Sequence, residues 1–257
     1  MWKRIWGFGL RHLYPLRRDL DLLSDMLYWP IIDILLWGIT SKWIGGEGAV
    51  SAVVPIITSL VLWNVIWRSQ SEVSRNLMDE IWNNNLVNLF STPLSLKEWI
   101  YGALLLSVFK MLLTISAMVP IVWFLYSVNI FAVGLWLLPF FALMVVTGWS
   151  VGFFSAGIVL RWGQRVQTVI WTLPGILLPL SAAFFPLALL PTFLRPIAYG
   201  LPTTYVFESM RSLVLTNSLN PQYIIISIAL NIIYLALSLW WFVRSFRYSI
   251  SLGLNRF

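Results

Sequence analysis

The chain has 257 residues, of which 59% are hydrophobic and 11% are charged, and its mean hydropathy is +0.81. These values exclude an ordinary soluble domain, because soluble domains average about 45–50% apolar residues and need more charge to cover their surface. The 16 tryptophans and 9 tyrosines fit aromatic belts at two membrane–water interfaces. The chain has no cysteine, and its net charge of +7 comes from basic residues at the ends of apolar segments rather than from a nucleic-acid-binding patch. The composition therefore predicts an all-α polytopic membrane protein with no nucleic-acid partner.

Residues 1–25 are predicted to form an interfacial amphipathic helix. Apolar residues recur at helical spacing from Trp2 to Leu13 and again after Pro15, with basic and acidic residues between them. Charges this dense exclude the apolar core of a signal peptide. Pro15 should kink or break the helix.

Six membrane spans are predicted from a length of roughly 20 apolar residues per crossing. They lie near 26–44, 50–69, 97–125, 131–160, 164–185 and 222–243. Thirteen of the 17 Lys and Arg residues then fall on one side of the membrane. The positive-inside rule places both termini, and the segment between the second and third spans, in the cytoplasm.

The longest polar interval of the chain, 72–98, follows the second predicted span. Its apolar spacing predicts a short helix over 76–90 that breaks near three consecutive asparagines. Pro93 should end this helix, because proline disfavours the α conformation of the preceding residue. Ser95 and Glu98 have the spacing of a capping box, which predicts that a new helix begins there.

Residues 174–202 contain six of the 13 prolines, which an uninterrupted helix cannot accommodate. We expect a re-entrant hairpin over 184–202 on the outer face, followed by an interfacial helix from about Thr203 to Val214. Within that helix Glu208 and Arg211 are three residues apart and can form an ion pair.

Asp33 and Lys110 are the charges that lie deepest in the predicted spans. Such charges usually face the protein interior or a cavity, which favours a substrate contact or a pair between the two. The alternative is that each lies near enough to an interface to be hydrated, with Lys110 extending toward water.

Residues 148–152 match the G-x-S-x-G pattern of a nucleophilic serine. The pattern lies in the middle of a span, and the only histidine is His12 in the N-terminal segment. The preferred interpretation is close helix packing at Gly148 and Gly152.

The sequence also lacks a phosphate-binding G-x-x-x-x-G-K-[ST] loop and an H-E-x-x-H motif. It therefore predicts no enzyme activity and no cofactor site in this chain, so the energy for any transport must come from a partner or an ion gradient.

Two stretches carry a family resemblance. The first comprises Arg75, Glu80, Leu86, Leu89, Ser91-Thr92-Pro93-Leu94-Ser95, Glu98 and Gly102, and the second is the run 194–211 before the last span. In order and spacing they resemble the membrane subunit of type-2 ATP-binding-cassette exporters. The N-terminal helix, the six spans and the chain length also agree, so the resemblance covers the whole chain. The chain departs from the family in having three asparagines where a glycine or a charged residue often stands.

The resemblance implies a permease of the plasma (inner) membrane that works as a homodimer or pseudo-dimer. Each permease would bind a separate ATPase subunit holding ATP and Mg²⁺, through a cytoplasmic coupling region at 71–95. The substrate would be amphipathic or lipid-linked: a drug, a lipid or a polysaccharide. The candidate ATPase-coupling residues are Glu80, Ile81, Asn84, Asn85 and Pro93. The candidate residues of a translocation path or outer gate are Asp33, Lys110, Pro174, Pro191, Glu208 and Arg211.

Two other classes remain open. A gradient-driven secondary transporter should show inverted repeats and an ion site at the midplane, and the sequence shows no convincing repeat of its halves. A membrane scaffold without transport would not need the proline-rich outer segment.

Overall fold

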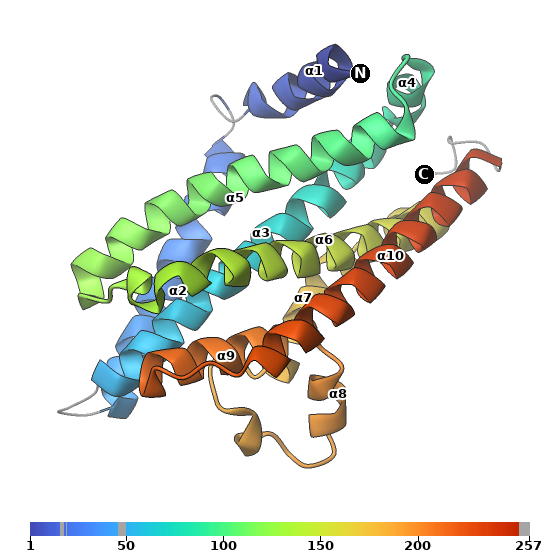
Figure 1. The fold of residues 1–257 in the computed structure, drawn as a ribbon. Helices are drawn as coiled ribbons and strands as arrows, with labels where there is room; N and C mark the ends of the chain where they lie inside the picture. Colours follow the sequence, from blue (N-terminus) through green and yellow to red (C-terminus); the bar gives the residue numbers. More distant parts are fainter. Residues whose placement is uncertain (16–17, 19, 46–49, 252–257) are drawn as a thin grey trace.

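The structure is a computed structural model that describes residues 1–15, 18, 20–45 and 50–251. Within these ranges the chain is all-α, with ten α-helices and short 3₁₀ turns (Figure 1). The α-helices are α1 (Trp2–Leu13), α2 (Leu20–Gly45), α3 (Val50–Trp82), α4 (Leu86–Ser91), α5 (Leu96–Tyr126), α6 (Leu137–Trp162), α7 (Val169–Leu180), α8 (Arg195–Tyr199), α9 (Pro202–Thr216) and α10 (Pro221–Ser251). The predicted all-α class is therefore confirmed.

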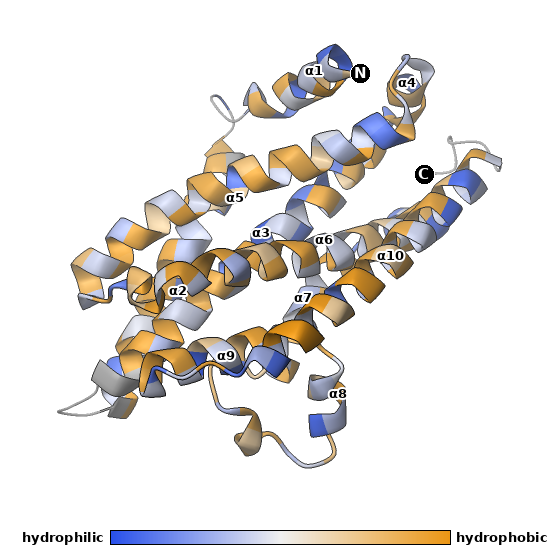
Figure 2. Cartoon of the chain, viewed as in Figure 1, coloured by the Kyte–Doolittle hydropathy of each residue, from blue (hydrophilic) through white to orange (hydrophobic). Residues whose placement is uncertain are grey.

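Three helical segments are long and apolar enough to cross a membrane: Leu96–Tyr126, Ile130–Val166 and Pro221–Ser251. Hydrophobic residues predominate along α5, α6 and α10 (Figure 2). These helices support a multi-pass membrane protein. α2 and α3, with 26 and 33 residues, also exceed the roughly 20 residues of one crossing.

The predicted fifth span, 164–185, is wrong in its extent. The helix there, α7, has 12 residues, and at 1.5 Å per residue it covers roughly 18 Å of an apolar layer about 30 Å thick. It contains Pro174 and Pro179 and ends at Leu180, and Ala182 then takes a left-handed conformation with φ of 53°. The prolines and this turn shorten the helix, because neither continues the α-helical hydrogen bonding.

α3 and α6 pack closely in the centre of the bundle, and two glycines of α6 explain how. A Cβ at Gly148 would lie 2.7 Å from the carbonyl oxygen of Ile66, and one at Gly152 would lie 2.9 Å from that of Gln70. Both positions therefore need a residue without a side chain. The hydroxyl of Ser150, which lies between them, donates a hydrogen bond to the carbonyl oxygen of Val146 in the same helix. The interpretation of residues 148–152 as a packing seam is confirmed.

The polar interval is divided differently from the prediction. α3 runs without a break to Trp82, so residues 76–82 continue a long helix and do not begin a separate one. The break falls at the asparagines, where Asn84 has a left-handed φ of 50°. α4 then ends at Ser91, before the extended Thr92 that Pro93 requires. α5 begins with both halves of the predicted Ser95–Glu98 capping box.

The N-terminal segment consists of α1 and the start of α2, with Pro15 between them; part of this junction lies outside the described residues. α1 lies beside the first half of α5, and Phe8 fills the space over Gly102, where a Cβ would be 2.5 Å from its ring. On the other side of α1, Trp2 and Trp6 remain 72% and 65% exposed. Some apolar side chains of α1 therefore pack against the protein, and others face away from it.

The proline-rich segment lies at the opposite side of the bundle from α1 and α4 (Figure 1). Residues 184–201 form an irregular connection with one 3₁₀ turn and the five-residue α8. The helix predicted from about Thr203 to Val214 is present as α9. Eight of its 15 residues are buried, so α9 packs into the bundle.

Candidate functional site

A network of buried ion pairs joins α2, α3 and α5. Lys110 Nζ lies 2.7 Å from Glu72 Oε2, and Glu72 Oε1 lies 3.6 Å from Arg68. Arg68 and Arg75 each place a guanidinium nitrogen 2.9 Å from Asp25 Oδ2. The side chains of Arg68, Glu72 and Lys110 are almost wholly buried. Charges in such surroundings are tolerated only when they are paired, so the network fixes how the three helices sit relative to one another.

The ion pair of Lys110 differs from the pair with Asp33 that the sequence suggested. Lys110 pairs with Glu72, not with Asp33. Asp33 is partly buried on α2, and within the described residues it has no ion pair. The proposed Asp33–Lys110 pair is therefore wrong.

A second set of charges attaches α1 to two parts of the polar interval 72–98. Arg11 lies 2.9 Å from Glu80 Oε2, which also accepts a 2.6 Å hydrogen bond from the side chain of Asn85. At the other end Arg4 lies 3.3 Å from Glu98 and donates to the carbonyl oxygen of Pro93. α1 thus links the end of α3, the turn before α5 and the cap of α5.

A polar cavity of about 620 Å³ lies between these two sets of charges. It is lined by Arg11, His12, Pro15, Ser24, Asp25, Trp29, Arg75, Asn76, Asp79, Glu80, Trp82, Asn83, Lys110 and Trp171. The lining combines acidic, basic and amide groups, so it suits a polar or zwitterionic group better than a single ion of either sign. Among the described residues no cluster of three or more His, Cys, Asp or Glu side chains is placed to hold a metal ion.

Three side chains in this cavity, those of Asp79, His12 and Asn76, could form hydrogen bonds to a ligand. Burial raises the pKa of Asp79 to about 6, although Arg75 and Lys110 act in the opposite direction. Burial, followed by the charges of Lys110 and Arg11, lowers the pKa of His12 to about 3, so its imidazole is neutral at pH 7. The His12 Nε2 and Asn76 Nδ2 atoms are buried without a hydrogen-bond partner. Together these groups offer unused hydrogen-bonding capacity and one carboxylate that changes charge near pH 6.

The candidate coupling residues divide into buried and exposed ones. Glu80 and Ile81 are only 2% and 1% exposed, so they lie in the interior of this chain and offer no surface to a partner. Asn84 and Pro93 are exposed, and Asn85 is partly exposed. The burial of Ile81 follows from the continuation of α3, whose last turns pack against the neighbouring helices.

The candidate outer residues also fall into two groups. Glu208 and Arg211 pair at 2.6 Å as the spacing predicted, and Arg211 donates to the carbonyl oxygens of Ala182 and Ala183. This contact attaches the turn after α7 to α9. Pro174 is buried in α7, whereas Pro191 is exposed in the connection that follows.

Sequence reasoning missed the partners Asp25, Arg68 and Glu72. Arg68 and Glu72 have the i, i+4 spacing of a helical ion pair, which was available from the sequence. Their connection to Asp25 and Lys110 bridges 43 and 38 residues of chain and needed the tertiary structure.

No protein-family model matches the chain, and no curated protein matches it.

Proposed function

We propose that this chain is the permease subunit of an ATP-driven exporter of the type-2 ATP-binding-cassette class. Its substrate would be amphipathic or lipid-linked, and ATP with Mg²⁺ would bind to a separate ATPase subunit. Two permease copies, or this chain and a similar one, would form the translocation path. The complex would lie in the plasma (inner) membrane, with both termini and the coupling region in the cytoplasm.

The attachment of the coupling region is the observation that carries this proposal. α4 and the turn around it present exposed polar side chains at Asn83, Asn84 and Asn88. The same region is held by ion pairs to α1 and continues covalently into α3 and α5. A force on this surface would therefore reach α3 through the asparagine turn and α5 through the turn at Pro93 and the capping box, as a lever between an ATPase and a membrane path requires.

The position of α1 supports an interfacial helix on the same side of the membrane as α4 and the end of α10. Trp2 and Trp6 on its exposed face are residues favoured at a membrane interface, while Ile5 and Phe8 on the other face are buried. α1, α4 and the C-terminal end of α10 lie at the same end of the bundle (Figure 1).

The experiment must use an exposed residue, because a charge introduced at the buried Ile81 would disturb folding whatever the function. We expect Asn88→Arg to reduce co-purification of the ATPase subunit at least tenfold, since a bulky cation would be forced into the contact. Gln222→Arg, an equally exposed change at the start of α10, is the matched control and should have no effect. If Asn88→Arg inserts normally and retains the ATPase and its hydrolysis rate, α4 is not the docking surface.

One observation favours a second candidate, a proton-coupled secondary transporter. Asp79 lines the polar cavity without an ion pair among the described residues, and its pKa of about 6 allows it to bind and release a proton at physiological pH. Vesicles that contain the chain with or without the ATPase subunit distinguish the two candidates. Uptake driven by a pH gradient without an ATPase supports the second, and uptake that requires ATP and the ATPase supports the first.

A further inference from the structure

A second cavity, of about 410 Å³, lies away from the coupling region, between α3, α6, α7, α9 and α10. Phe154, Leu237 and Trp240 border it and are themselves substantially exposed, so the cavity opens on the outer surface of α6 and α10. Most of its walls are leucine, isoleucine, valine and aromatic side chains, and no charged residue is among those that line it. A ligand in this cavity must be largely apolar and uncharged, because a charge here would have no counter-ion.

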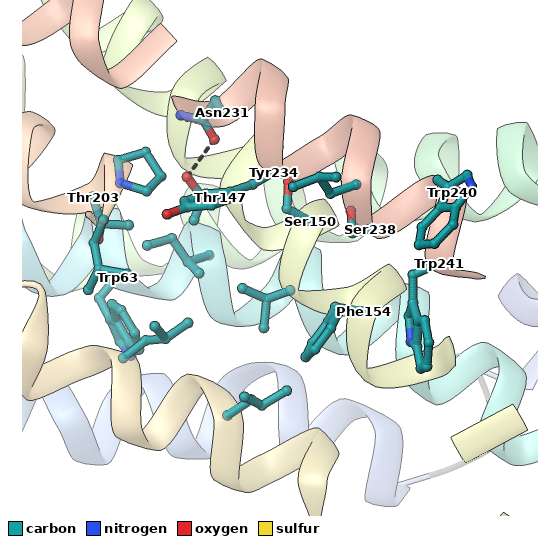
Figure 3. A pocket seen from close by; sticks show the side chains of 17 residues that line it. Trp63, Thr147, Ser150, Phe154, Thr203, Asn231, Tyr234, Ser238, Trp240 and Trp241 are labelled. Atoms are coloured by element: carbon teal, nitrogen blue, oxygen red, sulfur yellow. Dashed lines mark hydrogen bonds between the residues drawn. The ribbon is translucent and has the colours of Figure 1, made fainter. Parts of the chain in front are cut away.

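Several polar side chains interrupt this otherwise apolar lining. Asn231 and Thr147 lie at one end, joined by a 2.8 Å hydrogen bond, and Trp240 and Trp241 lie at the other (Figure 3). Ser150 also lines the cavity; its proton goes to a backbone carbonyl, which leaves oxygen lone pairs free to accept.

The carboxamide of Asn231 is incompletely paired. The residue is only 2% exposed, and its Nδ2 is buried without a hydrogen-bond partner. Thr147 has a single hydroxyl proton but faces two acceptors, Asn231 Oδ1 and the carbonyl oxygen of Leu143 at 3.0 Å. Turning the amide over lets Nδ2 donate to Thr147, which leaves Oδ1 without a partner instead. In both orientations one polar atom of a buried side chain stays unpaired, which is unfavourable.

We infer that this cavity binds a neutral amphipath drawn from the bilayer, with an apolar body along α6 and α10 and a hydroxyl head at Asn231. A hydroxyl both donates and accepts, so it satisfies the amide in either orientation, whereas a carbonyl satisfies only one. A phosphate or carboxylate head is disfavoured because the lining carries no cation. This site goes beyond the proposed function, since it uses neither the coupling region nor an ATPase.

The test uses the purified full chain in phosphatidylcholine nanodiscs, without an ATPase. Three photoreactive probes of equal chain length are compared: a long-chain alcohol, the matching alkane and the matching fatty acid at pH 9. The alcohol should label α6 and α10 peptides three- to tenfold more than the alkane or the fatty acid, as one net hydrogen bond predicts. Equal labelling by all three probes, or labelling spread over every lipid-facing helix, would overturn the inference.

Variants locate the head group. Asn231→Leu, which keeps the branched shape of the side chain and removes its polar atoms, should remove the preference for the alcohol. Ser245→Ala is the matched control, because Ser245 is a buried and unpaired hydroxyl on the same helix that does not line the cavity. If Asn231→Leu does not fold, Val151→Phe fills the cavity from α6 and should reduce labelling by all three probes. Persistence of the alcohol preference in the folded Asn231→Leu variant, or unchanged labelling in Val151→Phe, would refute the site.

Discussion

Replacement of Lys110 by methionine should strongly destabilise the protein. The 2.7 Å contact with Glu72 is buried on both sides, so methionine leaves Glu72 with only the more distant Arg68 at 3.6 Å. Breaking a buried pair by removing one partner costs about 3–5 kcal/mol, mostly from the charge that stays behind. For a chain of this size that corresponds to a fall in unfolding temperature of roughly 6–20 °C.

The measurement is thermal unfolding in mild detergent, followed by the fluorescence of the 16 tryptophans. Lys97→Met, an exposed change in the first turn of the same helix, is the control and should alter stability by less than about 0.5 kcal/mol. The double variant with Glu72→Gln should be less destabilised than the sum of the two single variants, by about 1–3 kcal/mol. If Lys110→Met loses less than about 1 kcal/mol, or if the two changes are additive, the reasoning from burial and pairing is refuted.

Three further predictions follow from other contacts. Gly152→Leu should destabilise the α3–α6 contact by about 2 kcal/mol or more, because even a Cβ at this position would lie 2.9 Å from a backbone oxygen. Ser150→Ala should change stability by less than about 1 kcal/mol, and the opposite ranking in detergent melting curves would contradict the packing seam. The Asp79→Asn variant should be more stable than the wild type by about 1–2 kcal/mol at pH 7 and equally stable at pH 4, because ionisation of a carboxyl with a raised pKa destabilises the folded protein as the pH rises from about 4 to 6. Melting curves at both pH values check the sign, and an equal difference at both would refute it. Of two single cysteines, Phe193→Cys should react with an impermeant thiol reagent in intact cells and Asn83→Cys should not, and the reverse result would invert the proposed topology.

The ion pairs of Glu80 and Glu98 would change how a motion of the proposed coupling region is transmitted. With Glu80 paired to Arg11 and Glu98 paired to Arg4, α1 is attached at both ends of the segment that would contact an ATPase. Movement of α4 would therefore also move a helix whose tryptophans are suited to the membrane interface. In the proposed mechanism the N-terminal helix would then be part of the lever, which follows from these contacts and not from its amphipathic pattern.

Local sequence determined the features that depend on neighbours along the chain. The capping box at Ser95, the helix stop before Pro93, the break at the asparagines and the Glu208–Arg211 pair are all present where the spacing predicted them. The glycine seam on α6 was also predictable, because two small residues four apart share one helix face. The extent of α7 was not, since an apolar run does not reveal where a helix containing two prolines ends.

The sequence by itself determined the all-α class, the long apolar helices and the local joints, because each depends on composition or on residues a few positions apart. Only the tertiary structure decided that Lys110 pairs with Glu72, that Glu80 and Ile81 face inward, and that Asn231 meets Thr147 across 84 residues of chain. Periodicity identifies which face of a helix is apolar, but it does not say which of several apolar helices that face will meet. In a chain that is apolar on most sides, only packing decides where each rare polar group finds its partner.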